Sequence, residues 1–279
     1  MTSYEPPRAV VRALVEAALA EDLGVMGDVT SLACIDPEET ATAVFVARDE
    51  GVFAGAALAT ETFAQLDSNL AVEWRARDGE TVQPGAELGR VSGSLQSILT
   101  GERTALNFLT HCSGIASLTR RYVDAARGKV RILDTRKTLP GLRAVQKAAV
   151  RAGGGFNHRE SLSAAILIKD NHLAALGVTR AVEQARTRWP GRTIEVECDT
   201  LDQVVEARDA GVDMALVDNM SPSEVQKAVA LAEGKVKIEV SGGVRLETVA
   251  EYAESGADFI SVGALTHSAP ALDIGLDVL

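Results

Sequence analysis

Cationic side chains are concentrated in one stretch of an otherwise acidic chain. The 279 residues include 28 Lys and Arg against 39 Asp and Glu, a formal net charge of −11, yet residues 131–172 hold eight Lys and Arg and only three acids. A local positive region on an acidic protein favours a concave site for a small anion, although a solvated basic helix face would give the same count. The overall acidity argues against nucleic acid and anionic membranes as partners, because their phosphates would be repelled.

Within this stretch, the residues with useful chemistry stand at predicted strand ends or after a triple glycine. They are Arg136 and Lys137 after strand 130–135, His158 and Arg159 after Gly153–Gly155, and Lys169 near the end of strand 164–170. Paired arginines match carboxylates through bidentate hydrogen bonds better than lysines do. A lysine near a buried strand end could instead form a Schiff base with a carbonyl substrate. The triple glycine could be either a mobile lid or a tight turn.

Acidic side chains follow the middle strands of the same region. Three acids alternate along the predicted strand 193–199 and therefore share one face, and one acid lies in each of the next two strands. The five acids are Glu195, Glu197, Asp199, Asp218 and Glu239. Carboxylates at neighbouring strand ends suit Mg²⁺ shared with a diphosphate. For any single acid, a structural ion pair with the cationic stretch is an equally good explanation.

Glycines follow the last two predicted strands. Ser241-Gly242-Gly243 comes after one strand and Gly263-Ala264 after the other. Glycine lets backbone N–H groups approach a phosphate, and a helix that begins there favours the negative charge. In βα barrels phosphate often binds at the last two strand ends, so the sequence predicts a phosphate site here.

The elements that must position these residues alternate between apolar strand and amphipathic helix from residue 130 onward. The predicted strands are 130–135, 164–170, 193–199, 214–219, 235–243 and 258–264. Capping boxes at Thr200 with Gln203 and at Ser221 with Glu224 mark helix starts. Repeated βα units with near-continuously apolar strands predict a parallel sheet covered by helices. Six units are too few for a complete barrel, so an incomplete, open parallel βα barrel is predicted, with a doubly wound sheet as the alternative.

The first 113 residues have a different pattern. A helix is predicted over about 7–21, and the stretches 41–55 and 71–93 alternate in hydrophobicity around Asp-Gly and Pro-Gly turns, as antiparallel strands do. A long helix over about 95–127 then leads into the βα region. An α/β amino-terminal domain is therefore predicted to precede the barrel.

Cysteine usage and hydropathy favour a cytoplasmic protein. The three cysteines are odd in number and far apart, which excludes a disulfide framework and a closely spaced cysteine metal site. No secretory signal peptide is recognisable at the start, and no apolar run approaches the length of a membrane span.

Several motifs of this chain resemble one family, the quinolinate phosphoribosyltransferases. The matching stretches are EDLGVMGDVTS near the start, GERTALNFLTHCSGIAS (101–117), ILDTRKTLPGLRAVQKAAVRAGGGFNHR (132–159), LIKDNH (167–172), IEVEC (194–198), LVDNM (216–220), EVSGG (239–243) and VGALTHS (262–268). The resemblance covers essentially the whole chain, and the succession DTRKT, GGGFNHR and IKDNH is highly specific.

This resemblance implies both an architecture and a reaction. An α/β sandwich domain would span residues 1–113, an incomplete βα barrel would span 114–265, and the tail 266–279 would return to the first domain. The family converts quinolinate and phosphoribosyl pyrophosphate into nicotinate mononucleotide, pyrophosphate and CO₂, a step of NAD biosynthesis. Its subunits form homodimers at least, and the assembly could be a hexamer.

The resemblance also implies roles for individual residues. Lys137, Glu197 and Asp218 are the expected catalytic residues, and Glu197 and Asp218 would face the ribose and hold Mg²⁺ directly or through the diphosphate and water. The residues expected around quinolinate are Arg103 from the partner subunit, Thr135, Arg136, Lys137, His158, Arg159 and Lys169. Those expected at the 5′-phosphate end are Ser241, Gly242, Gly243, Val262, Gly263 and Ala264, with His267 nearby.

Three other functions remain open from the sequence. A related phosphoribosyltransferase could use another aromatic acid, as the homologues encoded in molybdenum-transport operons suggest. A barrel lyase could use Lys169 as a Schiff base. A non-catalytic sensor could bind the phosphosugar without consuming it.

Overall fold

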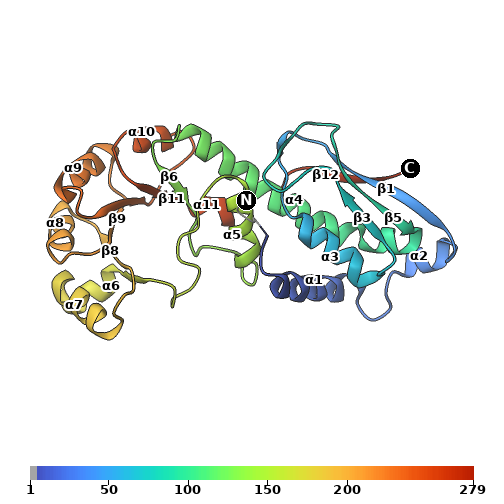
Figure 1. Cartoon of the computed structure of the whole chain (residues 1–279), viewed down its shortest axis with the longest axis horizontal. Helices are drawn as coiled ribbons and strands as arrows, with labels where there is room; N and C mark the ends of the chain where they lie inside the picture. The colour runs from blue at the N-terminus through green and yellow to red at the C-terminus, as the bar shows by residue number, and fades with distance from the viewer. Residues whose placement is uncertain (1–4) are drawn as a thin grey trace. The chain divides into compact units, whose positions relative to one another are not determined.

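The computed structural model describes residues 5–279, which form two units, each with its own core (Figure 1). The first unit comprises residues 5–120, 138–154 and 265–279, and the second comprises 121–137 and 155–264. Among the described residues, no helix is long and apolar enough to cross a membrane.

The first unit packs helices against an antiparallel sheet, as the alternating pattern predicts. Its four-stranded sheet has the order β12-β1-β5-β3, and β2 pairs separately with β4. The elements are α1 (Arg8–Leu23), α2 (Val29–Cys34), β1 (Thr40–Ala47), β2 (Gly51–Val52), α3 (Ala56–Leu66), β3 (Ala71–Trp74), β4 (Thr81–Val82), β5 (Glu87–Ser94), α5 (Arg143–Ala152) and β12 (Ile274–Val278). The buried rings of Phe45, Phe53 and Phe63 lie in its core.

The carboxyl-terminal strand β12 completes this first sheet. It pairs antiparallel with β1, with Ala43 opposite Val278 and Ala47 opposite Ile274. In Figure 1 the red strand β12 accordingly lies beside the blue strand β1. Chain segments more than 220 residues apart in sequence therefore share one sheet.

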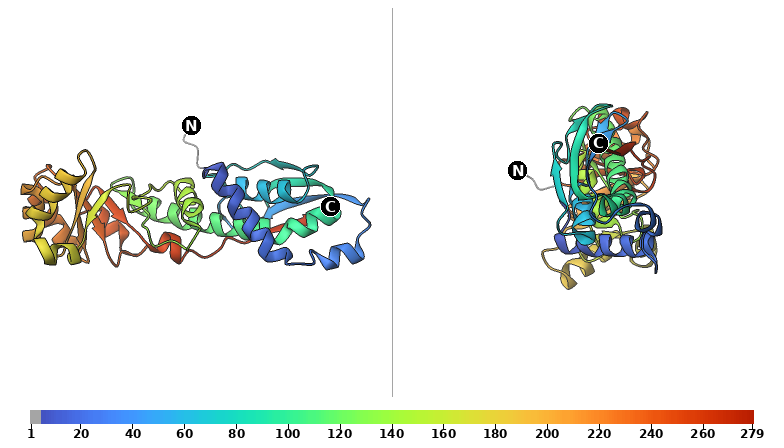
Figure 2. Two further views of the ribbon diagram at one scale, coloured as in Figure 1. Left: turned by 90° about the horizontal axis from the view of Figure 1, so that it is seen from below. Right: turned by 90° about the vertical axis from the view of Figure 1, so that its right-hand side faces the viewer.

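The second unit is built from the predicted βα repeats, and all six expected strands are present. Its elements are β6 (Arg131–Leu133), β7 (Ile166–Ile168), α6 (Asp170–Leu176), α7 (Val178–Arg188), β8 (Ile194–Cys198), α8 (Leu201–Asp209), β9 (Met214–Asp218), α9 (Pro222–Ala232), β10 (Lys237–Ser241), α10 (Val249–Ala253) and β11 (Phe259–Ser261). Both predicted capping boxes are confirmed, at the starts of α8 and α9. Helices α7, α8 and α9 pack on one side of the strands (Figure 1 and Figure 2).

The parallel sheet is an open barrel. Its strand order is β6-β11-β10-β9-β8-β7, so the strands follow one another around the sheet and β11 pairs with β6. That cyclic order excludes the doubly wound alternative, in which the strand order reverses at a switch point. Strands β6 and β7 are its two edges, and the opening lies between them.

The units divide the chain differently from the predicted boundary at residue 113. Helix α4 (Leu95–Ala125) continues without a break through that position, so no linker separates the units there. Helix α5 belongs to the first unit because buried Gln146 binds its neighbours within that unit. Its side chain donates to the carbonyl of Thr266 at 2.9 Å and accepts from the N–H of Leu139 at 3.0 Å.

Candidate active site

One face of the parallel sheet carries the polar residues. Glu197 on β8 stands opposite Leu216 on β9, which stands opposite Glu239 on β10. Side chains alternate between the two faces of a strand, so the residues two positions along, Asp218 and Ser241, share that face. The strand pattern thereby brings acids from three strands to one side of the sheet.

A cavity of about 380 Å³ opens on this face. It is lined by Thr135, Arg136, Lys137, His158, Arg159, Leu167, Lys169, Glu197, Leu216, Asp218, Glu239, Ser241 and Ser261. All of these residues belong to the second unit. Nine of the residues expected from the sequence are therefore brought together around one space.

The loop after the triple glycine places His158 and Arg159 at the opening of the barrel. Phe156 forms a parallel bridge with Leu133 of β6, and its N–H donates to the carbonyl of Ile132 at 2.8 Å. Phe156 thus forms a single bridge to the outer edge of β6, where no further strand of the described chain pairs. The carboxylate of buried Asp134 then accepts the N–H of His158 at 2.9 Å, which fixes the loop where it enters the cavity.

Two residues of the triple glycine must be small or glycine for the turn that they form. A Cβ at Gly153 would lie 2.4 Å from the carbonyl oxygen of Ala116 and 2.6 Å from Thr119 Cβ. Gly154 has φ +90°, in the left-handed region that favours glycine. Close packing of α5 against α4 therefore requires small residues at this turn.

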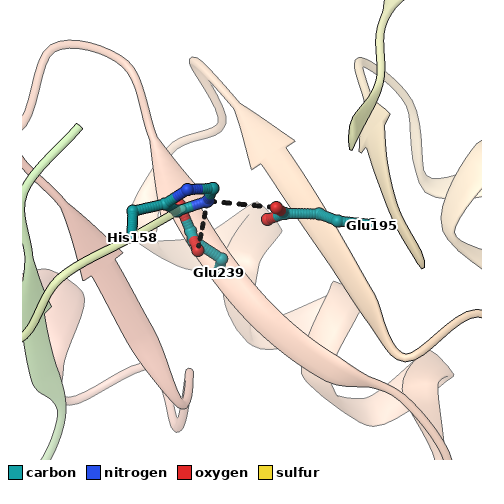
Figure 3. Close-up of side chains that lie close together, drawn as sticks. All are labelled: His158, Glu195 and Glu239. Atoms are coloured by element: carbon teal, nitrogen blue, oxygen red, sulfur yellow. Dashed lines mark hydrogen bonds and ion pairs between the residues drawn. The ribbon is translucent and has the colours of Figure 1, made fainter. Parts of the chain in front are cut away.

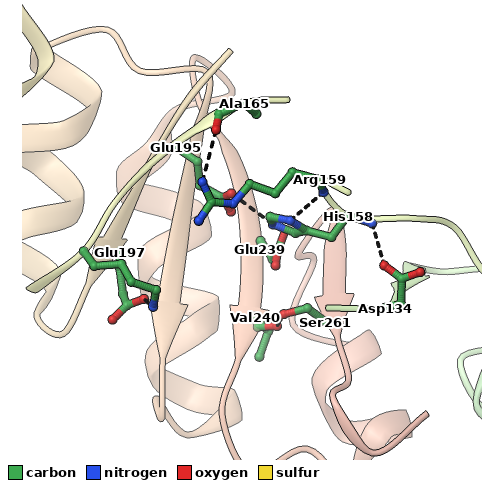
Figure 4. A network of polar contacts seen from close by, with 10 residues as sticks. Asp134, His158, Arg159, Ala165, Glu195, Glu197, Glu239, Val240 and Ser261 are labelled. Atoms are coloured by element: carbon green, nitrogen blue, oxygen red, sulfur yellow. Dashed lines mark hydrogen bonds and ion pairs between the residues drawn. The ribbon is translucent and has the colours of Figure 1, made fainter. Parts of the chain in front are cut away.

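Two guanidinium groups line the cavity close to each other. Burial lowers the pKa of Arg159, and the positive charge of Arg136 lowers it further. Arg159 is anchored by a hydrogen bond from Nη1 to the carbonyl of Ala165 at 3.1 Å (Figure 4). Because two like charges held together repel until an anion binds between them, the pair is suited to an acidic ligand.

Lys169 forms an ion pair with Glu197 in the same cavity. The Lys169 side chain is half-exposed, whereas Glu197 is nearly buried. A Schiff-base lysine must be a neutral amine in a desolvated site. Lys169 is instead half-exposed and contacts a carboxylate, so the geometry does not support the lyase hypothesis.

The turns that follow β9 and β10 are packed together at one end of the cavity. The N–H of Asn219 donates to the carbonyl of Ser241 at 2.9 Å, and Asn219 Nδ2 donates to Asp218 at 2.6 Å. A Cβ at Gly242 would lie 2.2 Å from Asn219 Oδ1, and the φ of Gly242 is +87°. Only glycine fits there, so the turn itself requires Gly242.

A buried group of His158, Glu195 and Glu239 lies at the floor of the site (Figure 3). His158 Nε2 is 3.0 Å from Glu195 Oε2 and 3.5 Å from Glu239 Oε2. The other ring nitrogen, Nδ1, accepts the N–H of Arg159 at 2.8 Å. A nitrogen that accepts a hydrogen bond carries no proton, so the ring proton is on Nε2 and points toward the carboxylates.

The remaining predicted residues lie outside the cavity lining. Gly242, Gly243, Gly263 and Ala264 follow the lining strands, and the N–H of Val262 is donated to the carbonyl of Leu133, within the sheet. The other two are in the first unit, where Arg103 is exposed on α4 and His267 is exposed on α11 (Ala264–His267).

Four lining residues were not among the site residues that the family resemblance implies, although Glu239 was one of the five strand-end acids. They are Leu167, Glu239, Leu216 and Ser261. The available signal was alternation, because each shares a face with a predicted site residue on the same or a neighbouring strand. Asp199, expected on that face, is exposed and does not line the cavity.

The donor set at the strand ends fits a magnesium ion. Glu197 and Asp218 present carboxylate oxygens to the same cavity from the carboxyl ends of neighbouring strands β8 and β9. Mg²⁺ is usually bound by one or two carboxylates together with substrate phosphates and water. These two residues would hold the ion, and it would neutralise the charge of a diphosphate bound there.

Comparison with known proteins identifies relatives over the whole chain. Family models for the quinolinate phosphoribosyl transferase amino-terminal and carboxyl-terminal domains match residues 28–113 and 115–277. A chloroplastic nicotinate-nucleotide pyrophosphorylase (carboxylating) from Arabidopsis thaliana is 42% identical, over 98% of this chain and 84% of that protein. A quinolinate phosphoribosyltransferase (decarboxylating) from Nicotiana glauca is 40% identical, over 98% of this chain and 83% of that protein.

Solved structures agree. The nicotinate-nucleotide pyrophosphorylase of Francisella tularensis superposes with a TM-score of 0.96 at 39% identity, covering 100% of this chain and 99% of that one. This structural match covers both units, including the residues that line the cavity. The two family models together match residues 28–113 and 115–277 of the same chain. The chain belongs to the quinolinate phosphoribosyl transferase family.

Proposed function

We propose that this protein transfers the phosphoribosyl group of phosphoribosyl pyrophosphate to the ring nitrogen of quinolinate, with decarboxylation. The products are nicotinate mononucleotide, pyrophosphate and CO₂, and the reaction is a step of NAD biosynthesis. The observation that carries this proposal is the cavity itself, in which the Arg136 and Arg159 guanidinium groups share one space with the Glu197 and Asp218 carboxylates.

The cationic side of the cavity suits quinolinate. Its two adjacent carboxylates are matched by Arg136 and Arg159, because guanidinium groups bind carboxylates in a bidentate manner. Lys169 and Lys137 supply further positive charge, and the hydroxyl of Thr135 accepts the N–H of Lys137 at 3.0 Å, which shapes the loop around the substrate. Neutralising both carboxylates would hold the pyridine ring in one orientation.

The acidic side suits the reacting sugar. As the bond between ribose C1 and the diphosphate oxygen breaks, positive charge develops on C1, and the carboxylates of Glu197 and Asp218 would stabilise it. The pyridine nitrogen then forms a bond to C1 and becomes cationic. The bond from C2 to its carboxyl carbon breaks, CO₂ leaves, the electron pair stays on the ring, and C2 takes up a proton.

No covalent enzyme intermediate is needed for these steps. The protein supplies positioning and preorganised charge, and positioning alone can contribute about 7–11 kcal/mol. We further propose Mg²⁺ as the cofactor at Glu197 and Asp218, on the strength of their donor set. The 5′-phosphate is assigned to the turns at Ser241–Gly243 and Gly263–Ala264, with His267 nearby.

One assay tests the reaction. The purified protein, mixed with quinolinate, phosphoribosyl pyrophosphate and Mg²⁺, is expected to release CO₂ and form nicotinate mononucleotide in equal amounts, and to form neither without Mg²⁺. Pyrophosphate release only with a different aromatic acid would keep the phosphosugar site and change the acceptor. Tight binding of phosphoribosyl pyrophosphate without turnover of any acceptor would contradict catalysis.

We also propose that the active form is a homodimer or a larger homo-oligomer acting in the cytoplasm, in which Arg103 of one subunit completes the partner's site. The exposed position of Arg103 on α4 supports this assignment. Arg103 belongs to the first unit, whereas the cavity-lining residues all belong to the second.

Mixing two inactive variants tests the shared site. Arg103→Ala and Arg159→Ala are each expected to be nearly inactive at low quinolinate concentration. A hybrid dimer has one site with both arginines, so random mixing should restore up to about a quarter of wild-type activity, half of the dimers being hybrids with one intact site. Recovery should require subunit exchange, for example by dilution and reconcentration. No recovery despite exchange proven by differently tagged subunits would contradict the shared site.

A further inference from the structure

We propose that Glu239 is a positioning residue of the active site, which keeps its proton, donates a hydrogen bond to the Glu195 carboxylate and thereby holds the His158 ring that contacts the Arg159 main chain. The inference rests on the proposed function, since Arg159 is taken there as a quinolinate ligand. From the sequence, Glu239 was considered only as one of five strand-end acids that could hold Mg²⁺, and it lines the cavity.

Two buried acids lie close together beside His158. Glu239 is fully buried and Glu195 is 4% exposed. Their nearest oxygen atoms and His158 Nε2 all lie within 4.8 Å of one another. Two carboxylates this close in a water-poor interior cannot both be ionised without a large cost, so one of them retains its proton.

Three carboxylate oxygens of these two acids accept no hydrogen bond from the part of the chain that the structure describes. Among the described residues, neither carboxylate oxygen of Glu239 nor Glu195 Oε1 has a hydrogen-bond partner, and His158 Nε2 approaches Glu239 Oε2 only to 3.5 Å. Buried acceptors without donors are costly. A proton on Glu239 supplies the missing donor, because it can be directed at the Glu195 carboxylate.

The surroundings favour Glu239 as the acid that keeps the proton. Burial, reinforced by the negative charge of Glu195, raises the pKa of Glu239 to about 8. The groups that face it are Glu195 from β8, His158 from the loop, the Ser261 hydroxyl from β11 and uncharged Leu216 from β9. Lys237, two positions earlier on β10, points its ammonium group at Asp258 instead.

Two hydrogen bonds of the His158 ring connect Glu195 to Arg159 in the substrate site. Glu195 accepts the His158 Nε2 proton at 3.0 Å, and His158 Nδ1 accepts the Arg159 N–H at 2.8 Å. Figure 4 shows this chain of contacts from the floor of the cavity to the Arg159 main chain. If Glu239 ionises, two adjacent carboxylates repel each other, and the ring that orients Arg159 loses its fixed support.

The resulting pH dependence has a defined sign. The protonated form of Glu239 is the competent one, so quinolinate binding weakens as pH rises through about 8. For one group that must be protonated, the KM for quinolinate should rise about tenfold between pH 7 and pH 9, with kcat changed less than about twofold.

The Glu239→Gln variant separates this proton from mere packing. An amide NH₂ donates to Glu195 as the protonated carboxyl does, but it does not titrate. The variant is expected to have a KM within about twofold of wild type at pH 7 and the same KM at pH 9. Glu251→Gln, the same change at an exposed position of α10, should keep the wild-type rise.

Infrared spectroscopy gives a second readout that needs no substrate. The wild-type difference spectrum between pH 7 and pH 9 should show loss of one protonated carboxyl C=O band, and that band should be absent from Glu239→Gln. A KM rise that persists unchanged in Glu239→Gln, or a wild-type spectrum without the band, would overturn the proposal. Failure of wild type to turn over quinolinate at any pH would instead count against the proposed function, and the infrared result would still stand.

Discussion

Replacing Arg159 with alanine is expected to raise the KM for quinolinate by about a hundredfold. Each charge-assisted hydrogen bond to a carboxylate contributes about 1.5–3 kcal/mol, and loss of a bidentate pair costs roughly 3 kcal/mol, which corresponds to about two orders of magnitude in affinity. Arg159 is already held in place: its main-chain N–H donates to His158 Nδ1, and its side-chain Nη1 donates to the carbonyl of Ala165. Little of the binding energy is therefore spent on ordering this side chain.

The same reasoning applies to Arg136, whose charge lies close enough to lower the pKa of Arg159. Arg136→Ala should raise the KM for quinolinate to a comparable extent. Arg159→Lys keeps the charge but loses the bidentate geometry, so its KM should fall between those of wild type and alanine. The KM for phosphoribosyl pyrophosphate should change by less than about threefold in all of these variants.

Steady-state kinetics at saturating phosphoribosyl pyrophosphate check these values. Arg180→Ala, which removes an exposed arginine from α7 of the same unit, is the matched control and should leave both KM values unchanged. A KM for quinolinate near that of wild type in both Arg136→Ala and Arg159→Ala would remove these residues from the substrate site.

Positions at or near strand ends, which the sequence indicates, account for part of this cavity. Lys169 directly follows β7, Glu197 is the penultimate residue of β8 and Asp218 ends β9, and all three line one cavity. The six strands were recognisable because buried parallel strands are nearly continuous in apolar residues. The helix starts were recognisable because the capping residues at Thr200 and Ser221 make local hydrogen bonds that need no tertiary context.

Features that depend on distant contacts could not be predicted in the same way. The position of His158 depends on Phe156 bridging β6 and on Asp134, more than 20 residues earlier, accepting its N–H. The proximity of Glu195 and Glu239 arises across β9, which separates β8 from β10 in the sheet. Neither relationship has a local sequence signal, because both depend on segments distant in sequence lying side by side in the folded sheet.

The unit to which α5 belongs has no local sequence signal for a related reason. Amphipathic α5 lies within the βα region of the sequence, yet its buried Gln146 binds Leu139 and the carbonyl of Thr266 in the first unit. Periodicity shows that a helix has an apolar face, but it does not show which core that face covers.

Replacing Asp218 with asparagine is expected to lower kcat by about 10²- to 10³-fold, with a small change in the KM for quinolinate. Loss of one preorganised group that stabilises transition-state charge typically costs about 2.7–4 kcal/mol. Asn is nearly isosteric with Asp and keeps an oxygen that can accept the Asn219 Nδ2 bond, so the main loss is the negative charge. Asp202→Asn, on exposed α8, should keep wild-type kcat.

The magnesium dependence of Asp218→Asn distinguishes the two roles of that carboxylate. If Asp218 helps to hold the ion, the Mg²⁺ concentration for half-maximal rate should rise at least tenfold, and excess Mg²⁺ should restore part of the loss. If it acts only on the charge developing at ribose C1, kcat should fall while the Mg²⁺ requirement stays the same. Glu197→Gln is a less direct test, because it also releases the ammonium group of Lys169 from its ion pair. A kcat for Asp218→Asn within threefold of wild type at every Mg²⁺ concentration would contradict both roles, and it would leave the acidic side of the cavity with Glu197 alone as the group that faces the sugar.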